Sequence, residues 1–181
     1  MRVIAGSKRR TLLETPVGEN TRPTQDRIKE TLFNMIGPDI VDCVFLDCFA
    51  GSGQMGIEAL SRGAKFSYFI EQDKSALKCI QNNLNKTKLV DYSQVLSCDI
   101  FSCLNRINKK VDFVFMDPPY NHLFEKRVLE ELKNLDIITD ETIIIVEASL
   151  DTDFSYTKDL EFNIIKEKIY KTNKHIFLQR A

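Results

Sequence analysis

The chain has 181 residues, a formal net charge of −1, 43% hydrophobic residues and 28% charged residues. This length suits a single domain with its own core, and the composition is ordinary for a globular protein. No apolar run approaches the length of a membrane span and the N-terminus has no signal-peptide core, so we expect a cytoplasmic protein without a membrane partner.

The N-terminal segment is basic. Residues 2–13 alternate weakly between apolar and polar side chains, which predicts a hairpin or arm within residues 1–20, followed by one compact domain at 21–181. Residues 1–29 carry a charge balance of +4, whereas the remainder carries −5. Such an end can contact a polyanion or can be a solvated surface, and charge alone does not decide between them. The candidate contacts are Lys8, Arg9 and Arg10.

Strand and helix patterns alternate through the rest of the chain. Strands are predicted at 43–46, 66–70, 93–97, 111–116 and 142–146. Helices are predicted after Thr24, at 54–62, at 74–86 and through 124–132, and the last segments, 160–170 and 174–179, predict an antiparallel hairpin. This alternation indicates an α/β fold, with a mostly parallel sheet, helices on both faces and a reversed terminal hairpin.

The first predicted strand runs into a glycine-rich turn. Gly51, Gly53 and Gly56 match the spacing G-x-G-x-x-G, and Glu71 lies 20 residues after Gly51. This pattern is the formal dinucleotide-binding fingerprint, although a lone match can also serve only the geometry of the turn.

Asp47 argues against a dinucleotide. A carboxylate at the end of this strand would repel the pyrophosphate that such a turn binds. S-adenosylmethionine has no phosphate and carries an ammonium and a sulfonium, both of which gain from a nearby anion. Glu71 could accept hydrogen bonds from ribose hydroxyls with either ligand. The pair therefore favours S-adenosylmethionine over a nicotinamide cofactor.

Carboxylates follow four successive predicted strands. Ligand sites in parallel sheets lie beyond the carboxyl ends of the strands, so we expect these side chains to converge on one crevice. Any one of them, Asp99 in particular, could instead cap the helix that follows. The four residues are Asp47, Glu71, Asp99 and Asp117.

Residues 117–120 read Asp-Pro-Pro-Tyr. Two prolines make a stiff segment without two backbone donors, so its carbonyls and the Asp117 carboxylate form a set of acceptors. Methylation of an exocyclic amine on a base needs such a set, because the nitrogen becomes cationic as the carbon–nitrogen bond forms. Tyr120 offers a face on which an extruded base can stack. A turn with a buried tyrosine is the alternative.

With this motif the chain resembles the amino-methylating branch of class I S-adenosylmethionine-dependent methyltransferases, whose hallmark is (Asp/Asn/Ser)-Pro-Pro-(Tyr/Phe/Trp). Over nearly its whole length it is similar to the RsmD family of small-subunit ribosomal RNA guanine 2-amino methyltransferases. That similarity lies in residues 2–6, 21–34 and 46–64.

The resemblance implies a monomer with a seven-stranded Rossmann-like sheet, an N-terminal hairpin that grips RNA, and one guanine methylated on a partly assembled small ribosomal subunit. Asp117, Pro118, Pro119 and Tyr120 would hold that guanine. The cofactor residues would be Asp47, Phe49, Gly51 and Gly53 at the methionine, Glu71 at the ribose, Asp99 at the adenine amine, and Arg22 and Thr24 at the border. Relatives often have a glycine among the basic arm residues, and 8–10 have none.

Four other functions remain open from the residues alone. A DNA adenine methylase usually needs a recognition region for which this chain has little room, and protein-glutamine methylases tend to have asparagine where Asp117 stands. A nicotinamide oxidoreductase is disfavoured by Asp47, and a catalytically inactive RNA-binding module stays open because sequence does not show turnover. The five cysteines contain no C-x-x-C pair, so we expect reduced thiols and, with only two histidines, no metal site.

Overall fold

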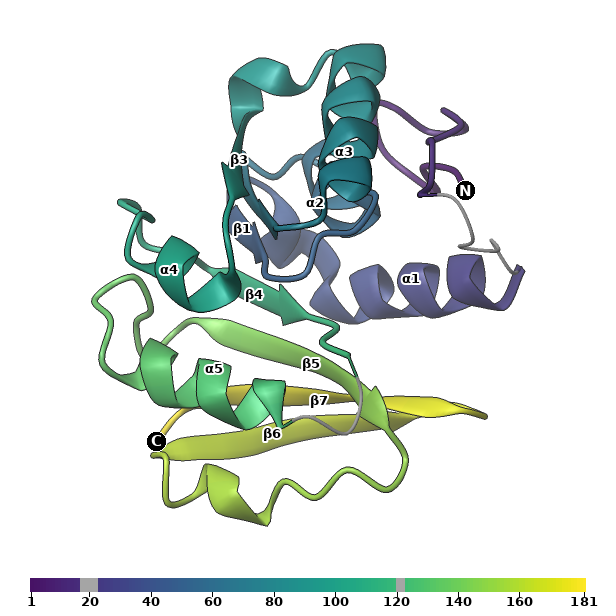
Figure 1. The fold of residues 1–181 in the computed structure, drawn as a ribbon. Coiled ribbons are helices and arrows are strands. Elements are labelled where there is room, and N and C mark those ends of the chain that lie inside the picture. The colour runs from purple at the N-terminus through teal and green to yellow at the C-terminus, as the bar shows by residue number, and fades with distance from the viewer. Residues whose placement is uncertain (17–22, 120–122) are drawn as a thin grey trace.

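A computed structural model describes residues 1–16, 23–119 and 123–181. Within them the strands form a seven-stranded sheet in the order β3-β2-β1-β4-β5-β7-β6 (Figure 1). The first five strands are parallel and β7 runs antiparallel to both its neighbours, which confirms the predicted α/β sheet with a reversed terminal hairpin. The strands are β1 (Val44–Asp47), β2 (Phe66–Glu71), β3 (Ser93–Ser97), β4 (Phe113–Met116), β5 (Ile143–Ser149), β6 (Phe162–Ile169) and β7 (Asn173–Arg180).

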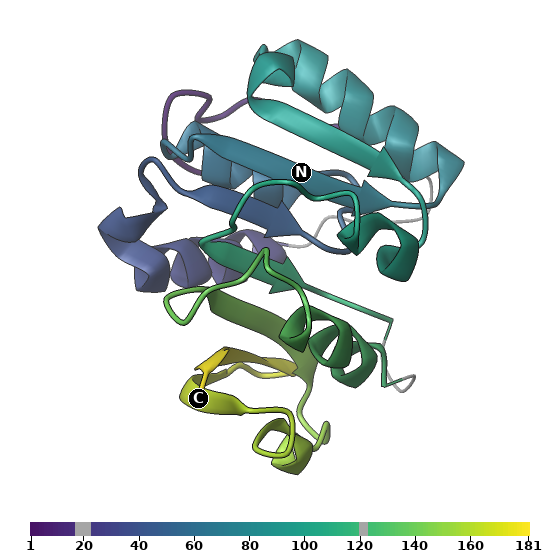
Figure 2. The same cartoon turned by 90° about the vertical axis from the view of Figure 1, so that its left-hand side faces the viewer.

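Helices cover both faces of the sheet, as predicted. Successive side chains of a strand point to opposite faces, so Phe45 joins the core under the first three helices while Leu46 joins the core under the last two. In Figure 2, α4 and α5 lie on the near side of the sheet and α1 lies on the far side. The helices are α1 (Pro23–Ile36), α2 (Gln54–Ser61), α3 (Lys74–Thr87), α4 (Ile100–Leu104) and α5 (Phe124–Lys133). No described helix combines the length and apolarity that crossing a bilayer requires.

The chain order of the strands reverses at β1. β1 pairs with β2 on one side and with β4 on the other, so the connections after β1 and after β4 diverge. Parallel sheets bind ligands beyond the carboxyl ends of the strands at such a switch point. The glycine turn after β1 and the Asp-Pro-Pro segment after β4 therefore enter the same region of the molecule.

The N-terminus forms the predicted hairpin. Arg2 bridges Leu12 in antiparallel fashion, and the Val3 amide donates to the carbonyl of Thr11 at 3.0 Å. The turn through the basic residues closes with Arg10 in the left-handed region, at φ 71°. This position is strained for an arginine, whereas glycine adopts that conformation without a Cβ clash.

The hairpin is docked on α2 through a buried carboxylate. Glu58 is fully buried, and its two oxygens accept the backbone amides of Ile4 and Ala5 at 2.8 and 3.0 Å. Arg62 donates to the same carboxylate at 2.8 Å, and Lys29 lies 3.7 Å from it. Separating the hairpin from α2 would leave the buried carboxylate of Glu58 without two of its donors, which is energetically costly. The hairpin is therefore a fixed part of the domain. The boundary at residue 20 stays a prediction, because residues 17–20 lie outside the described part.

The structure adds one element and corrects one expectation around Asp99. The predicted helices do not include residues 100–104, but these five residues form α4, which is too short to show a helical period. Cys98 and Cys103 are joined in a disulfide across this helix, with their Cα atoms 5.7 Å apart, so the expectation of five reduced thiols is wrong for this pair. Cys43 and Cys48 remain buried thiols, and burial raises the pKa of both, that of Cys43 to about 12.

Candidate active site

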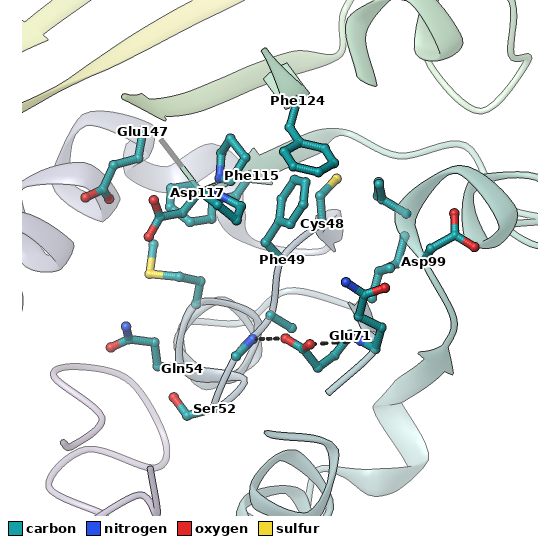
Figure 3. A pocket seen from close by; sticks show the side chains of 18 of the residues that line it. Cys48, Phe49, Ser52, Gln54, Glu71, Asp99, Phe115, Asp117, Phe124 and Glu147 are labelled. Atoms are coloured by element: carbon teal, nitrogen blue, oxygen red, sulfur yellow. Dashed lines mark hydrogen bonds between the residues drawn. The ribbon is translucent and has the colours of Figure 1, made fainter. Parts of the chain in front are cut away.

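A cleft of about 970 Å³ opens beyond the carboxyl ends of the parallel strands (Figure 3). This volume lies at the upper end of the range for small-molecule sites, which suits a cofactor together with part of a second substrate. Its wall includes seven of the residues predicted for the site, namely Phe49, Gly51, Glu71, Asp99, Asp117, Pro118 and Pro119. Gly53 and Asp47 are not part of the wall, and Arg22 and Tyr120 lie outside the described residues. Thr24 lies in α1.

The three glycines of the predicted fingerprint are needed for different structural reasons. Gly51 and Gly53 adopt positive φ angles of 52° and 78°, which let the chain turn from β1 into α2. Gly56 lies within α2, where a Cβ would overlap the ring of Phe69 on β2. The start of α2 therefore packs closely against β2. Of the three glycines, Gly51 is the one that lies on the cleft wall.

Glu71 at the end of β2 is fixed on the cleft wall by backbone amides. One oxygen accepts the amide of Gly51 at 2.8 Å, and the other accepts the amides of Gln72 and Asp73 at 2.8 and 2.9 Å. Figure 3 shows the carboxylate beside the glycine turn. Each carboxylate oxygen has about two acceptor positions, so the oxygen facing Gly51 retains one for a ligand.

Asp47 lies beneath the glycine turn. Its side chain is 1% exposed; one oxygen accepts the Gly56 amide at 3.3 Å, and the other has no hydrogen-bond partner. Burial raises the pKa of Asp47 to about 7, the charge of Glu71 adds to this rise, and the backbone amides of Gly56 and Phe49 lower it. An unpartnered buried carboxylate oxygen is costly, and it is a feature that a cationic ligand could relieve.

Asp99 has the capping role that the sequence left open. Its carboxylate accepts the amide and the hydroxyl of Ser102, at 3.1 and 2.5 Å, and so caps α4. Both hydrogen bonds lower the pKa of Asp99, the one from the hydroxyl more strongly. Asp99 is nevertheless exposed on the cleft wall, so capping leaves room for a ligand contact.

Asp117, Pro118 and Pro119 enter the cleft directly after β4. Pro118 is buried, whereas Asp117 and Pro119 are exposed to the cleft. The described part of the motif therefore lies in the same cavity as the glycine turn, as the strand-end argument predicts. The stacking role of Tyr120 stays a prediction.

Aromatic side chains that the sequence analysis did not single out form one side of the cleft. The ring of Phe124 meets the ring of Phe49 edge-on, with centroids 6.2 Å apart, and stacks with Phe101 at 6.5 Å. The guanidinium of Arg127 lies 4.4 Å from the ring centroid of Phe101. Phe101 follows Asp99 closely in the chain, but the pairing with Phe124 joins α4 to α5 and has no local sequence signal.

Glu147 is a cleft residue that sequence reasoning missed although a signal existed. It follows the apolar start of β5, as the four predicted carboxylates follow their strands, and it lines the same cavity as Asp117. The same strand-end argument, extended to the fifth predicted strand at 142–146, indicates Glu147.

The basic residues of the hairpin lie around a second, shallower hollow. This hollow has a volume of about 470 Å³ between the hairpin and α1. Arg9 and Arg10 are exposed there, whereas Lys8 is half-buried and is not part of its wall. The ionic side chains around it are Arg2, Arg9, Arg10, Asp26, Arg27 and Glu30, with Arg2 paired to Asp26 at 3.2 Å. At the other end of the hairpin, Met1 lines the large cleft, so the hairpin is close to the site rather than remote from it.

The sheet order, the glycine turn and the crevice at the switch point define a Rossmann-like fold, and the similar proteins place it in the methyltransferase class. A solved Escherichia coli structure, described as a candidate methyltransferase, superposes with a TM-score of 0.86 at 32% identity, covering 100% of this chain and 98% of that one. A family model described as "Conserved hypothetical protein 95" matches residues 1–179. The chain therefore belongs to this family, the RsmD family.

Two curated relatives are similar over most of their length. Ribosomal RNA small subunit methyltransferase D of Escherichia coli (strain K12) is 34% identical over 93% of this chain and 84% of its own. A Bacillus subtilis (strain 168) protein named as a candidate rRNA methyltransferase, YlbH, is 39% identical over 81% of this chain and 82% of its own.

Proposed function

We propose that this protein transfers a methyl group from S-adenosylmethionine to the exocyclic 2-amino group of a guanine in small-subunit ribosomal RNA. One observation supports this proposal above the others. A cleft of about 970 Å³ has on its wall both Glu71, beside the glycine turn, and the acceptor segment that begins at Asp117. The names of the relatives support ribosomal RNA as the substrate.

The residues around the glycine turn fit S-adenosylmethionine. The unpartnered buried oxygen of Asp47 lies under the turn that Gly51 opens to the cleft, and it would gain from a ligand ammonium. Glu71 has an acceptor position left for a ribose hydroxyl, and exposed Asp99 could accept an adenine amine. A pyrophosphate in the same place would meet two carboxylates, which is the reason a nicotinamide dinucleotide fits poorly.

The bound cofactor supplies a methyl group on a sulfonium, which leaves as a thioether. The protein supplies acceptors. Asp117 and Pro118 lie on the cleft wall. There the Asp117 carboxylate and the Pro118 carbonyl would hold the amine hydrogens of the base and stabilise the positive charge that develops on its nitrogen. The proton released from that nitrogen passes to solvent, because Asp117 is exposed and need not be a strong base.

The hairpin supports contact with RNA. Exposed Arg9 and Arg10 lie around the hollow beside α1, and the same hairpin reaches the large cleft through Met1. A phosphate backbone held at these arginines would place a nearby extruded guanine at the cleft. We propose a partly assembled small subunit as the substrate and a monomer as the active form, following the family resemblance.

The test is methyl transfer from labelled S-adenosylmethionine to three substrates, namely small-subunit particles, naked small-subunit rRNA and duplex DNA. The proposal predicts label in RNA and none in DNA, with particles preferred over naked rRNA. Calorimetry in parallel should show binding of S-adenosylmethionine and none of a nicotinamide dinucleotide. Label in DNA or protein alone, or binding of the dinucleotide alone, would refute the proposed function.

A further inference from the structure

Glu147 is held in a fixed orientation on the cleft wall by side chains of β7. Asn173 donates to one oxygen of its carboxylate at 2.5 Å, and Nε2 of His175 lies 3.1 Å from the other oxygen. Glu147 and His175 are direct cross-strand partners of the β5–β7 pair. His175 is 1% exposed and packs edge-on against Phe115, with ring centroids 6.2 Å apart. The carboxylate is therefore positioned by two strands at once.

The hydrogen-bond chain fixes the tautomer of the histidine. Tyr170 Oη lies 3.1 Å from Nδ1 of His175, and burial together with the charge of Glu147 raises the pKa of this tyrosine to about 12. An ionised Glu147 can only accept, so Nε2 of His175 carries the hydrogen in this contact, and Nδ1 of the neutral ring then accepts the hydroxyl of Tyr170. Both partners then donate to the Glu147 carboxylate. Its remaining acceptor positions are left for a ligand in the cleft.

The free capacity of Glu147 faces the target site. An ionised carboxylate offers about four acceptor positions, of which Asn173 and His175 occupy two. The Glu147 side chain is 19% exposed and lines the same cavity as Asp117. β4 and β5 are neighbours paired at Met116 and Val146, so Asp117 and Glu147, the residues that follow these two, lie at the same level along the two strands. Figure 3 shows both carboxylates on the same side of the cleft.

Two acceptors in this arrangement suit guanine better than adenine. The Watson–Crick edge of guanine carries two neighbouring donors, N1–H and the 2-amino group. On the same edge adenine carries a donor and an acceptor, and its N1 lone pair would face a carboxylate. A site built to accept from a donor rejects an analogue that lacks that donor, because the buried acceptor is left unpaired or repelled.

We propose that Glu147 is a specificity-determining residue that accepts the N1–H of the target guanine while Asp117 accepts its 2-amino group. His175 and Asn173 are positioning residues for Glu147. This inference rests on the proposed function and deepens it, because it assigns the discrimination of guanine to a side chain outside the Asp-Pro-Pro-Tyr motif.

The test separates the N1–H from the amine. After the methylated guanine has been mapped with the wild-type protein, an rRNA fragment is made with either guanine or 2,6-diaminopurine at that position. 2,6-Diaminopurine retains the 2-amino group but has a lone pair at N1. The wild type should methylate the guanine RNA about tenfold to a hundredfold faster in single turnover, with equal binding of the two RNAs.

Two variants and one control complete the experiment. In E147Q an amide hydrogen can face the N1 lone pair, so the preference for guanine should fall at least fivefold, and E147A should lose it as well. The matched control is E141Q, the same substitution at an exposed residue before β5. Thermal unfolding and cofactor affinity are measured for all three, and E141Q should keep the wild-type preference.

The outcomes distinguish the two levels of the proposal. No methyl transfer to RNA by the wild type would refute the proposed function. Transfer to guanine with equal rates on the diaminopurine RNA would refute only the role of Glu147, whether or not the variants fold. Retention of the full preference by a folded E147Q or E147A would refute it too.

Discussion

The carboxylate of Glu71 accepts the backbone amide of Gly51 at 2.8 Å, which joins the end of β2 to the turn that follows β1. The residue that we propose to contact a ribose is thus also the residue that orients the turn. Neighbouring Asp73 has a different function, because it caps α3 through the amides of Ser75 and Ala76 and does not line the cleft.

Substitutions of Glu71 and Asp73 distinguish a ligand contact from a helix cap. Glu71→Ala should weaken S-adenosylmethionine at least tenfold, since a hydrogen bond to a charged group contributes about 1.5 to 3 kcal/mol. Asp73→Ala should lower the folding stability through the lost cap and leave cofactor affinity within about twofold. Calorimetric titration with urea unfolding measures both quantities. Equal loss of affinity in the two variants would show that Glu71 acts only through the fold.

Asp47 should make stability depend on pH in an unusual direction. Its folded pKa of about 7 lies above the ordinary value of 3.8, so the folded state binds more protons than the unfolded state between these values. This contribution therefore stabilises the protein at low pH, is lost as the pH rises toward 7, and is constant above.

Replacing this carboxylate by a neutral amide removes that dependence. Relative to wild type, Asp47→Asn should gain more than about 1 kcal/mol of unfolding free energy between pH 5 and pH 8, because one unit of pKa shift corresponds to about 1.4 kcal/mol. The same variant should bind S-adenosylmethionine at least tenfold more weakly, since a ligand cation loses its counter-charge. Urea unfolding at the two pH values and calorimetry check this. An equal stability difference at pH 5 and pH 8 would contradict it.

Arg10 combines a charge with a strained backbone. Its φ of 71° is left-handed, so Arg10→Gly should raise the free energy of unfolding by about 0.5 to 1 kcal/mol while removing a phosphate contact. The slope of log affinity for RNA against log salt should decrease by about one. Arg9→Gly is the control, because Arg9 is not among the residues with positive φ and should lose affinity without gaining stability. Unchanged salt slopes in both variants would argue against an RNA contact at this turn.

Gly6 controls the docking of the hairpin on α2. A Cβ at Gly6 would overlap the carbonyl of Ser61, to which the Ser7 amide donates at 2.7 Å. Gly6→Ala should therefore destabilise the protein by at least about 2 kcal/mol, through overlap in addition to backbone strain. Gly37→Ala isolates the strain, since Gly37 also has a positive φ of 67° but has no atom within 4 Å of the added Cβ. Equal destabilisation of both variants in urea unfolding would mean that the hairpin yields without cost.

The sequence predicted the elements whose signals are local. Continuous apolar runs identified the buried strands, and strand-end carboxylates identified the crevice, because parallel strands place their carboxyl ends at one edge. The pairs that join distant segments have no such signal. Glu58 with Ile4, Phe124 with Phe49, and Glu147 with His175 depend on packing between elements. Asp47 shows a further limit of prediction from sequence. Its position after the first strand predicts a place at the crevice, but its burial beneath the turn depends on packing that has no local sequence signal.

Nucleoside analysis after single-turnover methylation of small-subunit particles tests the central claim most directly, with wild type and Asp117→Ala compared at saturating S-adenosylmethionine. The wild type should yield 2-methylguanosine as its product. Asp117→Ala should be slower by about two orders of magnitude, as loss of a transition-state electrostatic contact can be, while its fold and cofactor affinity persist. Methylated adenine as the sole product, or a variant rate equal to that of the wild type, would contradict the account.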